Sequence, residues 1–298
     1  MSDTRERIGL IGVGLLGTAI AERLIDAGFR VLACDPDSAR LRSLTVEVAP
    51  SPQAVAEAVD RCVLCLPDSD VVDEVVFGSD GLVSATRHRV ELVLDTTTGD
   101  PDRSSDFARR LAEAGVRFVD APVTGSSVDL RRGRAAVMVG GSDEAIEGAR
   151  DLLEALSGVT YRMGVAGSGL RAKLASNLLL GLQRLALAES LVFGEAIGID
   201  AATLLEVLRA GPAYSKAMDS KGRKMIERDW SPQARLAQHR KDVRLILEQA
   251  EALGLRLSLS DVHASVLDAG IERGFGDLDN SSVLDVLRAL RSEQDVAE

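Results

Sequence analysis

The sequence has little that would support a disulfide scaffold, a metal site or a membrane-spanning segment. Only three of its 298 residues are cysteine and three are histidine, and aromatic residues make up 3%. A disulfide scaffold needs more cysteines, and the scattered histidines lack metal-ligand spacing. No run of 18 uncharged apolar residues occurs, so we expect no membrane-spanning helix. The GxSxG, HExxH and P-loop patterns are also missing, which leaves serine or zinc hydrolysis without support.

Positive charge is in deficit as well. Lys and Arg total 35 against 46 Asp and Glu, which gives a net charge of −11. A chain this acidic is a poor partner for nucleic acid or for anionic membranes, because neither the phosphate backbone nor anionic lipid attracts it. An anionic small substrate remains compatible with a locally basic site. The few cysteines, and a glycine-rich start that a signal peptide does not need, favour a cytoplasmic protein.

The first half of the chain alternates short apolar runs with helical stretches, as in a Rossmann-type, doubly wound α/β domain with a mainly parallel sheet. We assign this domain to residues 1–165. The expected strands are Arg7–Ile11, Arg30–Cys34, Arg61–Leu66, Val90–Asp95, Arg117–Asp120 and Ala135–Val139. The expected helices are Leu15–Ala27, Pro52–Val59, Val71–Val76, Pro101–Ala114 and Asp143–Leu156.

The second half is different, because apolar residues recur at helical spacing and no strand pattern follows residue 165. The segment from Gly169 to Glu195 predicts one helix of about 25 residues, roughly 38 Å long. Further helices are expected over Ala201–Arg209, Tyr214–Arg228, Leu236–Ala252, Leu259–Arg273 and Ser282–Arg291. We therefore expect an all-α domain over residues 166–298, led by a long interdomain helix that starts after the joint Gly164–Gly169.

A glycine-rich segment between the first strand and the first helix matches the dinucleotide-binding pattern GxGxxG. It reads Gly12-Val13-Gly14-Leu15-Leu16-Gly17. In this pattern the first glycine permits a tight turn, the second lets the backbone approach a pyrophosphate, and the third lets helix and strand pack closely. The start of the helix then faces the phosphates with its free N–H groups.

Asp35 ends the second strand, 18 residues after Gly17. A carboxylate there accepts hydrogen bonds from ribose hydroxyls and repels a 2′-phosphate, so we expect NAD to be preferred over NADP. Arg40 and Arg42 lie close by in the sequence and leave NADP open as an alternative.

Lys173 and Asn177 are four residues apart near the start of the long helix, so they share one face. A lysine can act as a general acid and base when its surroundings lower its pKa. The ordinary alternative is a solvated lysine on an amphipathic helix, and spacing alone does not decide between them.

Taken together, these residues resemble the 3-hydroxyisobutyrate dehydrogenase family, the β-hydroxyacid dehydrogenases related to 6-phosphogluconate dehydrogenase. The resemblance covers nearly the whole chain in the family's order. The segments that carry it are Ile8–Gly28, Leu66-Pro67-Asp68, Asp95-Thr96-Thr97-Thr98, Asp120-Ala121-Pro122-Val123-Thr124-Gly125, Gly167–Asn177 and Lys241-Asp242.

The resemblance implies roles that the residues alone do not assign. Lys173 would be the general acid and base, with its pKa depressed by Lys241, and Asn177 would position the lysine and the substrate. Thr124, Gly125 and Ser126 would hold the substrate carboxylate, largely through backbone N–H groups. The resemblance further implies cofactor contacts at Leu66, Pro67, Val71, Thr98 (beside the nicotinamide) and Lys241, and a substrate contact at Asp242.

The resemblance implies an NAD-dependent oxidoreductase that transfers a hydride between nicotinamide and a small 3-hydroxy carboxylate, of the 3-hydroxyisobutyrate or tartronate semialdehyde/glycerate type. It also implies a homodimer or homotetramer. Ser126 and Asp129–Arg132 depart from the family's glycines, and Gln233–Arg235 displaces its aromatic residue, so the substrate stays open. An imine reductase is the nearest alternative, although such enzymes usually lack a lysine at position 173. A non-catalytic dinucleotide-binding sensor or scaffold is the alternative of another class.

Overall fold

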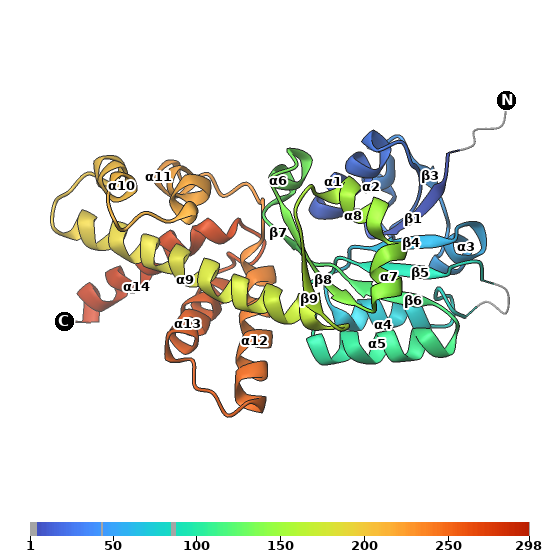
Figure 1. Cartoon of the computed structure of the whole chain (residues 1–298). Helices are drawn as coiled ribbons and strands as arrows, with labels where there is room; N and C mark the ends of the chain where they lie inside the picture. The colour runs from blue at the N-terminus through green and yellow to red at the C-terminus, as the bar shows by residue number, and fades with distance from the viewer. Residues whose placement is uncertain (1–4, 43, 85–87, 298) are drawn as a thin grey trace. The chain divides into compact units, whose positions relative to one another are not determined.

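The computed structural model describes residues 5–42, 44–84 and 88–297. The chain divides into two compact units, Met1–Lys173 and Leu174–Glu298. The division falls inside helix α9 (Ser168–Ala196), which is one continuous helix (Figure 1). Because that helix continues through the division, the domain boundary at residue 165 remains a proposal.

Nine strands form one sheet in the described part of the first unit. They are β1 (Arg7–Ile11), β2 (Arg30–Cys34), β3 (Glu47–Val48), β4 (Arg61–Leu64), β5 (Leu92–Asp95), β6 (Arg117–Asp120), β7 (Val123–Thr124), β8 (Ala136–Gly141) and β9 (Thr160–Gly164). Their order is β3-β2-β1-β4-β5-β6-β8-β7, and β9 pairs with β8. The strands from β1 to β6 run parallel, and β8 runs antiparallel to β6 and β7. The predicted mainly parallel sheet is thus confirmed.

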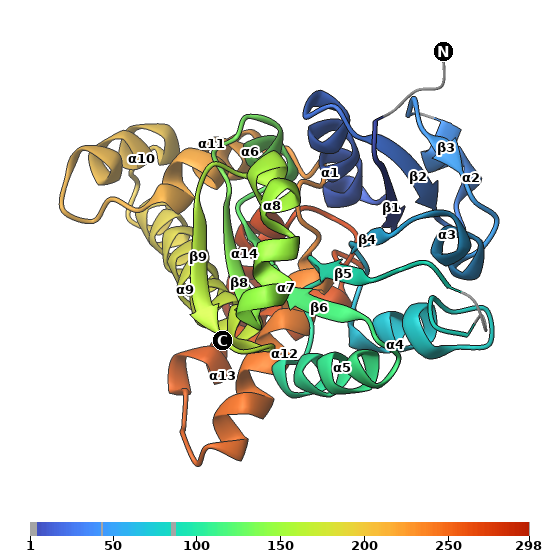
Figure 2. The ribbon, with the colours of Figure 1, turned by 45° about the vertical axis from the view of Figure 1, so that its right-hand side comes forward.

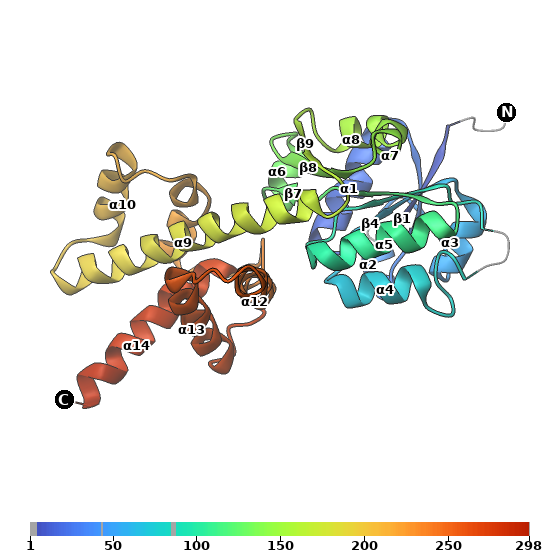
Figure 3. The ribbon, with the colours of Figure 1, turned by 60° about the horizontal axis from the view of Figure 1, so that its bottom comes forward.

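Helices cover both faces of the sheet (Figures 2 and 3). One core contains residues of α1 (Leu15–Asp26), α6 (Ser127–Arg131), α7 (Asp143–Gly148) and α8 (Arg150–Leu156). The other core contains residues of α3 (Pro52–Ala58), α4 (Ser69–Phe77) and α5 (Pro101–Glu113). A short helix, α2 (Ser38–Arg42), follows β2.

The two cores follow from the two-residue period of the strands, whose successive side chains point to opposite faces. On β5, Leu92 and Leu94 lie in the first core, whereas Val93 between them lies in the second. On β1, Gly9 makes room for α3, because a Cβ there would lie 2.5 Å from Cγ1 of Val55. Strands with both faces buried read as continuous apolar runs, which is why the sequence predicted them within one or two residues.

Several short elements were not predicted. The strands β3 and β7 have two residues each, too few to show an alternating pattern. The edge strand β9 has all five residues exposed, so it carries no buried pattern either. The helix predicted over Asp143–Leu156 is divided at Ala149 into α7 and α8, and the short helices α2 and α6 were missed.

The described part of the second unit is helical, as predicted. Its elements after α9 are α10 (Ala201–Ala210), the π-helical turn Met218–Gly222, α11 (Arg223–Glu227), α12 (Leu236–Ala252), α13 (Ser258–Glu272), the 3-10 turn Asn280–Ser282 and α14 (Val283–Ala297). The helix predicted over Tyr214–Arg228 is therefore interrupted. Within the described residues, no helix has both the length and the apolar character needed to cross a membrane.

The helical unit also buries charged groups. Lys221 Nζ lies 2.8 Å from Oδ1 of Asp279, which is fully buried. Burial opposes ionisation of Asp279, but Lys221 lowers the pKa of this carboxyl below its ordinary value. His263 is buried with its ring centroid 5.1 Å from that of His239. Burial, and then the positive charges of Arg184 and Arg240, lower the pKa of His263 to about 4.

This depressed pKa predicts a loss of stability in mild acid. The unfolded chain binds a proton at His263 near pH 6.5 and the folded chain only near pH 4, so stability falls as the pH drops between those values. Between pH 7 and pH 5, we expect His263 to remove about 2 kcal/mol from the free energy of unfolding. Urea unfolding at both pH values should show a smaller acid loss in His263→Gln than in the wild type. Equal losses would contradict this account.

Candidate functional site

The glycine-rich loop after β1 has the backbone geometry that its pattern predicts. Gly12 has a φ of +93°, and a Cβ there would lie 2.2 Å from the carbonyl oxygen of Cys65. A Cβ on Gly17 would lie 2.0 Å from the carbonyl oxygen of Gly12. Both positions therefore require glycine, one for the turn and one for the close approach of α1 to the loop.

The same loop leaves room for a ligand. A Cβ added to Gly14 would meet no atom within 4 Å, so the backbone is open to a group approaching from outside. Gly14 also precedes α1 without supplying a side-chain cap, and the first turn of α1 holds no acidic residue. Uncapped N–H groups at a helix start suit a phosphate. The loop lies where the strand order reverses, between β2 and β4, which is the usual dinucleotide position in this fold.

The other residues of the loop frame this opening. Leu15 is the first residue of α1 and is half exposed, whereas Leu16 packs against the first core. The Val13 N–H donates a 2.7 Å hydrogen bond to Oδ2 of Asp35. Asp35 thus joins the loop to the end of β2, and Arg40 lies 3.7 Å from the same carboxylate oxygen. Arg42 instead donates to the Ser38 hydroxyl.

The remaining cofactor residues predicted in the first unit follow β4 and β5. The Leu66 N–H donates to Oγ1 of Thr97 at 3.0 Å, and the Val71 N–H donates to Oδ1 of Asp68 at 3.0 Å. Pro67 is exposed between β4 and α4, and Thr98 is half-buried after β5. Because β1, β2, β4 and β5 are parallel, their carboxyl ends meet at one edge, and the structure brings these predicted residues together there.

The predicted substrate turn connects β7 to α6. Thr124 ends β7, and Gly125 adopts a φ of +115°. Ser126 caps α6 in a capping box with Asp129: Oγ of Ser126 accepts from the Asp129 N–H, and the Ser126 N–H donates to Oδ2 of Asp129 at 3.1 Å. The serine that departs from the family's glycine therefore fixes the turn. The S-x-x-D pattern at residues 126–129 signalled this cap, and our sequence analysis missed it.

Lys173 is buried rather than solvated. Its side chain lies on α9, and Nζ donates a 2.8 Å hydrogen bond to the carbonyl oxygen of Val123. Val123 directly precedes Thr124, so the amine is held beside the predicted substrate turn. The two features belong to the same unit of the structure.

Three further predicted residues lie together in the helical unit. The Asn177 side-chain amide donates to Oδ2 of Asp242 at 2.9 Å, and Lys241 Nζ lies 3.4 Å from Oδ1 of the same carboxylate. Asn177 and Asp242 are both buried. Asp242, predicted as a substrate contact, thus holds Asn177 and Lys241 in place.

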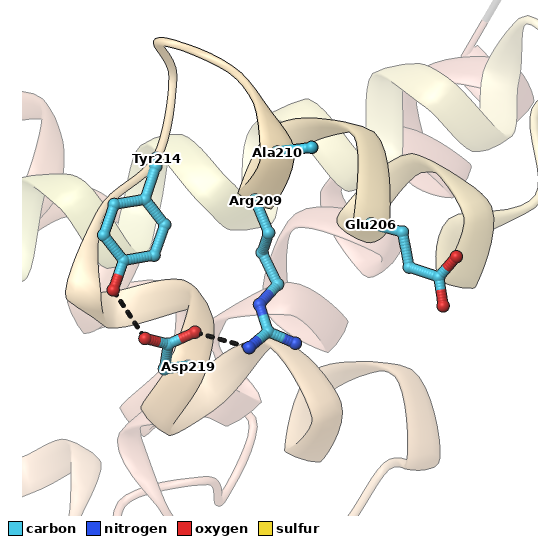
Figure 4. Close-up of a pocket in the computed structure, with 5 residues that line it drawn as sticks. All are labelled: Glu206, Arg209, Ala210, Tyr214 and Asp219. Carbon is cyan, nitrogen blue, oxygen red and sulfur yellow. Dashed lines mark hydrogen bonds and ion pairs between the residues drawn. The ribbon is translucent and has the colours of Figure 1, made fainter.

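A surface pocket on the helical unit is lined by other residues, namely Glu206, Arg209, Ala210, Tyr214 and Asp219 (Figure 4). Three of its polar groups satisfy one another, because Tyr214 donates to Asp219 at 2.6 Å and Arg209 lies 2.7 Å from that carboxylate. None of the residues predicted from the sequence lines it. Nor do the described residues contain a cluster of three His, Cys, Asp or Glu able to hold a metal ion.

Two family models match the chain one after the other. Residues 7–164 match the NAD binding domain of 6-phosphogluconate dehydrogenase. Residues 167–287 match the model described as NAD-binding of NADP-dependent 3-hydroxyisobutyrate dehydrogenase. These matches agree with the loop, turn and helix described above.

Individual proteins give the same result. The 2-hydroxy-3-oxopropionate reductase of Escherichia coli (strain K12) is 30% identical over 290 residues, covering 97% of this chain and 99% of that protein. The structure of Mycobacterium tuberculosis 3-hydroxyisobutyrate dehydrogenase with L-serine matches with a TM-score of 0.82 and 26% identity, over 96% of this chain and 100% of that one. An imine reductase from Pseudomonas sp. shares the fold at a TM-score of 0.60 and 17% identity, over 95% of this chain and 100% of that one. The chain therefore belongs to the 3-hydroxyisobutyrate dehydrogenase family of NAD(P)-dependent hydroxyacid oxidoreductases.

Proposed function

We propose that the protein transfers a hydride reversibly between NAD and a small 3-hydroxy carboxylate, of the 3-hydroxyisobutyrate or tartronate semialdehyde/glycerate type, with Lys173 as general acid and base. The observation that carries the proposal is the buried Lys173 amine, held by Val123 beside the turn of Thr124, Gly125 and Ser126. In a 3-hydroxy acid the hydroxyl is only a few bonds away from the carboxylate. An acid whose carboxylate rests on this turn therefore presents its hydroxyl to the amine.

The proton chemistry follows from the lysine and its partner. When bound, the nicotinamide ring supplies the hydride acceptor and donor. In oxidation, the neutral Lys173 amine takes the proton of the substrate hydroxyl as the hydride leaves the carbinol carbon. In reduction, the protonated amine returns that proton to the carbonyl oxygen. The Val123 carbonyl accepts an N–H from either form, so the amine keeps its orientation through the cycle.

The turn and the helical residues have separate tasks in this proposal. The backbone of Thr124 and Gly125 holds the substrate carboxylate, while the Ser126–Asp129 capping box keeps the turn in shape. Asn177 positions the lysine and the substrate, and its amide is fixed by Asp242. Holding the reacting groups in one orientation supplies much of the rate acceleration.

Replacing Lys173 by alanine tests the acid–base role. We expect turnover to fall by about 10²–10⁴-fold, because that is the usual contribution of a positioned general acid or base. The affinity for the dinucleotide should stay within about threefold, since the glycine-rich loop is untouched. The measurements are NADH formation from a panel of hydroxy acids and dinucleotide titration.

Arg171→Ala is the matched control for that variant. Arg171 lies two residues away on the same helix, where its half-exposed side chain pairs with Asp102 at 2.8 Å. We expect it to keep turnover within about twofold, as surface ion pairs contribute little. Near-normal turnover in Lys173→Ala would contradict the assignment. A wild type that binds NAD yet oxidises no hydroxy acid would favour an imine substrate or a sensor.

The proposed preference for NAD rests on Asp35, which directly follows β2 and whose carboxylate accepts the Val13 N–H of the glycine-rich loop. In Asp35→Ser, we expect the ratio of kcat/KM with NADP to kcat/KM with NAD to rise at least about tenfold. The serine keeps a small polar side chain, while the charge that repels a 2′-phosphate is gone and Arg40 is close enough to attract one.

Asp37→Ser is the control, because Asp37 also lies near Arg40, at 3.2 Å, but is half exposed. Its cofactor ratio should change less than about threefold. Kinetics with both dinucleotides would check this pair. An unchanged ratio in Asp35→Ser would refute the role of Asp35 in choosing the cofactor.

A further inference from the structure

The start of helix α9 lacks a cap of its own. The first N–H groups of a helix have no partner within it and are normally satisfied by Ser, Thr, Asp or Asn at the N-cap. In α9 the residue before the helix is Gly167, and the third helical residue is Leu170. Neither side chain can accept a hydrogen bond, so a capping box is impossible here.

A carboxylate from the sheet takes the place of that cap. Asp120 is the last residue of β6 and is fully buried. Its Oδ1 accepts the Gly167 N–H at 2.7 Å, and its Oδ2 accepts the Leu170 N–H at 2.9 Å. One side chain, 47 and 50 residues away from its two donors, thus satisfies both N–H groups of a capping box.

Two glycines leave the space for this carboxylate. A Cβ at Gly140 would lie 2.4 Å from Oδ1 of Asp120, and a Cβ at Gly169 would lie 2.7 Å from Oδ2. Larger residues would push the carboxylate away from the helix. The strand, the helix start and these glycines therefore form one close-packed junction.

The junction bears directly on the lysine. Leu170 and Lys173 are three residues apart, so they lie on adjacent turns of one face. Three residues after Asp120, the carbonyl of Val123 accepts the Lys173 amine at 2.8 Å. The segment Asp120–Val123 thus contacts α9 at two points. Asp120 binds the start of the helix, and Val123 binds the side chain of Lys173.

We propose that Asp120 is a positioning residue for Lys173, which orients the start of α9 so that the amine meets the substrate turn. The inference rests on the proposed function, because it gives Asp120 a task only if Lys173 is the acid and base. Burial raises the pKa of Asp120, while the N–H groups of Gly167 and Leu170 act against that rise, as expected for a carboxylate that these donors stabilise.

The test is Asp120→Asn, which keeps the size of the side chain but turns an acceptor into a donor facing an N–H group. We expect kcat to fall by about 10–100-fold while the dinucleotide affinity stays within about threefold. The pH limb of kcat that depends on Lys173 should also move to lower pH. Replacing the carboxylate by a neutral amide removes a negative charge from the segment that holds the amine through Val123, and this disfavours the ammonium form. A merely structural defect would lower the amplitude and leave the limb in place.

Asp200→Asn is the control for the loss of a helix cap. Asp200 caps α10 by accepting the Thr203 N–H at 2.9 Å, and α10 carries none of the predicted site residues. It should keep kcat within about twofold with an unmoved pH limb. Should Asp120→Asn not fold, Asp120→Ser, which has one hydroxyl in place of the two carboxylate oxygens, takes its place in the same test.

Hydrogen exchange on the wild type gives a readout that needs no variant. The amides of Gly167, just before the helix, and of Leu170, in its first turn, should exchange slowly, although neither has a partner within the helix. Rapid exchange there, or an unmoved pH limb in the variants, would overturn the role of Asp120. If Lys173→Ala keeps its turnover, the proposed function itself fails. If that variant is inactive while Asp120→Asn is normal, only this inference fails.

Discussion

The carboxyl ends of parallel strands all lie at one edge of a sheet, and this constraint organises the first unit. Because β1, β2, β4 and β5 share that direction, Gly14, Asp35, Pro67 and Thr98 are carried to the same edge from distant parts of the sequence. The reversal of strand order beside β1 then leaves an opening at the glycine-rich loop. The proposed position for the dinucleotide is therefore a consequence of topology, and the proposed preference for NAD rests on a side chain at this edge.

The position of Lys173, the proposed general acid and base, depends on a different kind of contact. The lysine lies on a helix that starts without a local cap, so the position of its first turn is set by the sheet through Asp120 and Val123. A buried carboxylate that satisfies two backbone donors is costly to replace, because its loss leaves both donors without partners. The same segment continues into Thr124 and Gly125. The lysine and the proposed substrate turn are therefore both positioned by one short stretch of backbone, residues 120–125.

Much of the fold and part of the candidate site could be predicted from local sequence patterns. Apolar runs located the main strands, the spacing of Gly12, Gly14 and Gly17 predicted the loop, and the four-residue separation of Lys173 and Asn177 predicted their common face. The tertiary contacts of the site residues could not be predicted from local patterns, since Asp120 binds Leu170 across 50 residues of sequence and Asn177 binds Asp242 across 65. The burial of Lys173, which distinguishes it from a solvated surface lysine, likewise depends on tertiary packing. The Ser126–Asp129 box was within reach of the sequence, because both partners belong to one local pattern.

The central claim is that a hydride passes between the carbinol carbon of a 3-hydroxy carboxylate and nicotinamide. Its most direct test is to supply the wild-type protein with NAD and with 3-hydroxy carboxylates that carry deuterium on the carbinol carbon, and to weigh the reduced dinucleotide by mass spectrometry. The account predicts one deuterium in each NADH formed, together with slower turnover than with the unlabelled acid. NADH without deuterium, or binding of NAD with no turnover of any acid in the panel, would contradict it.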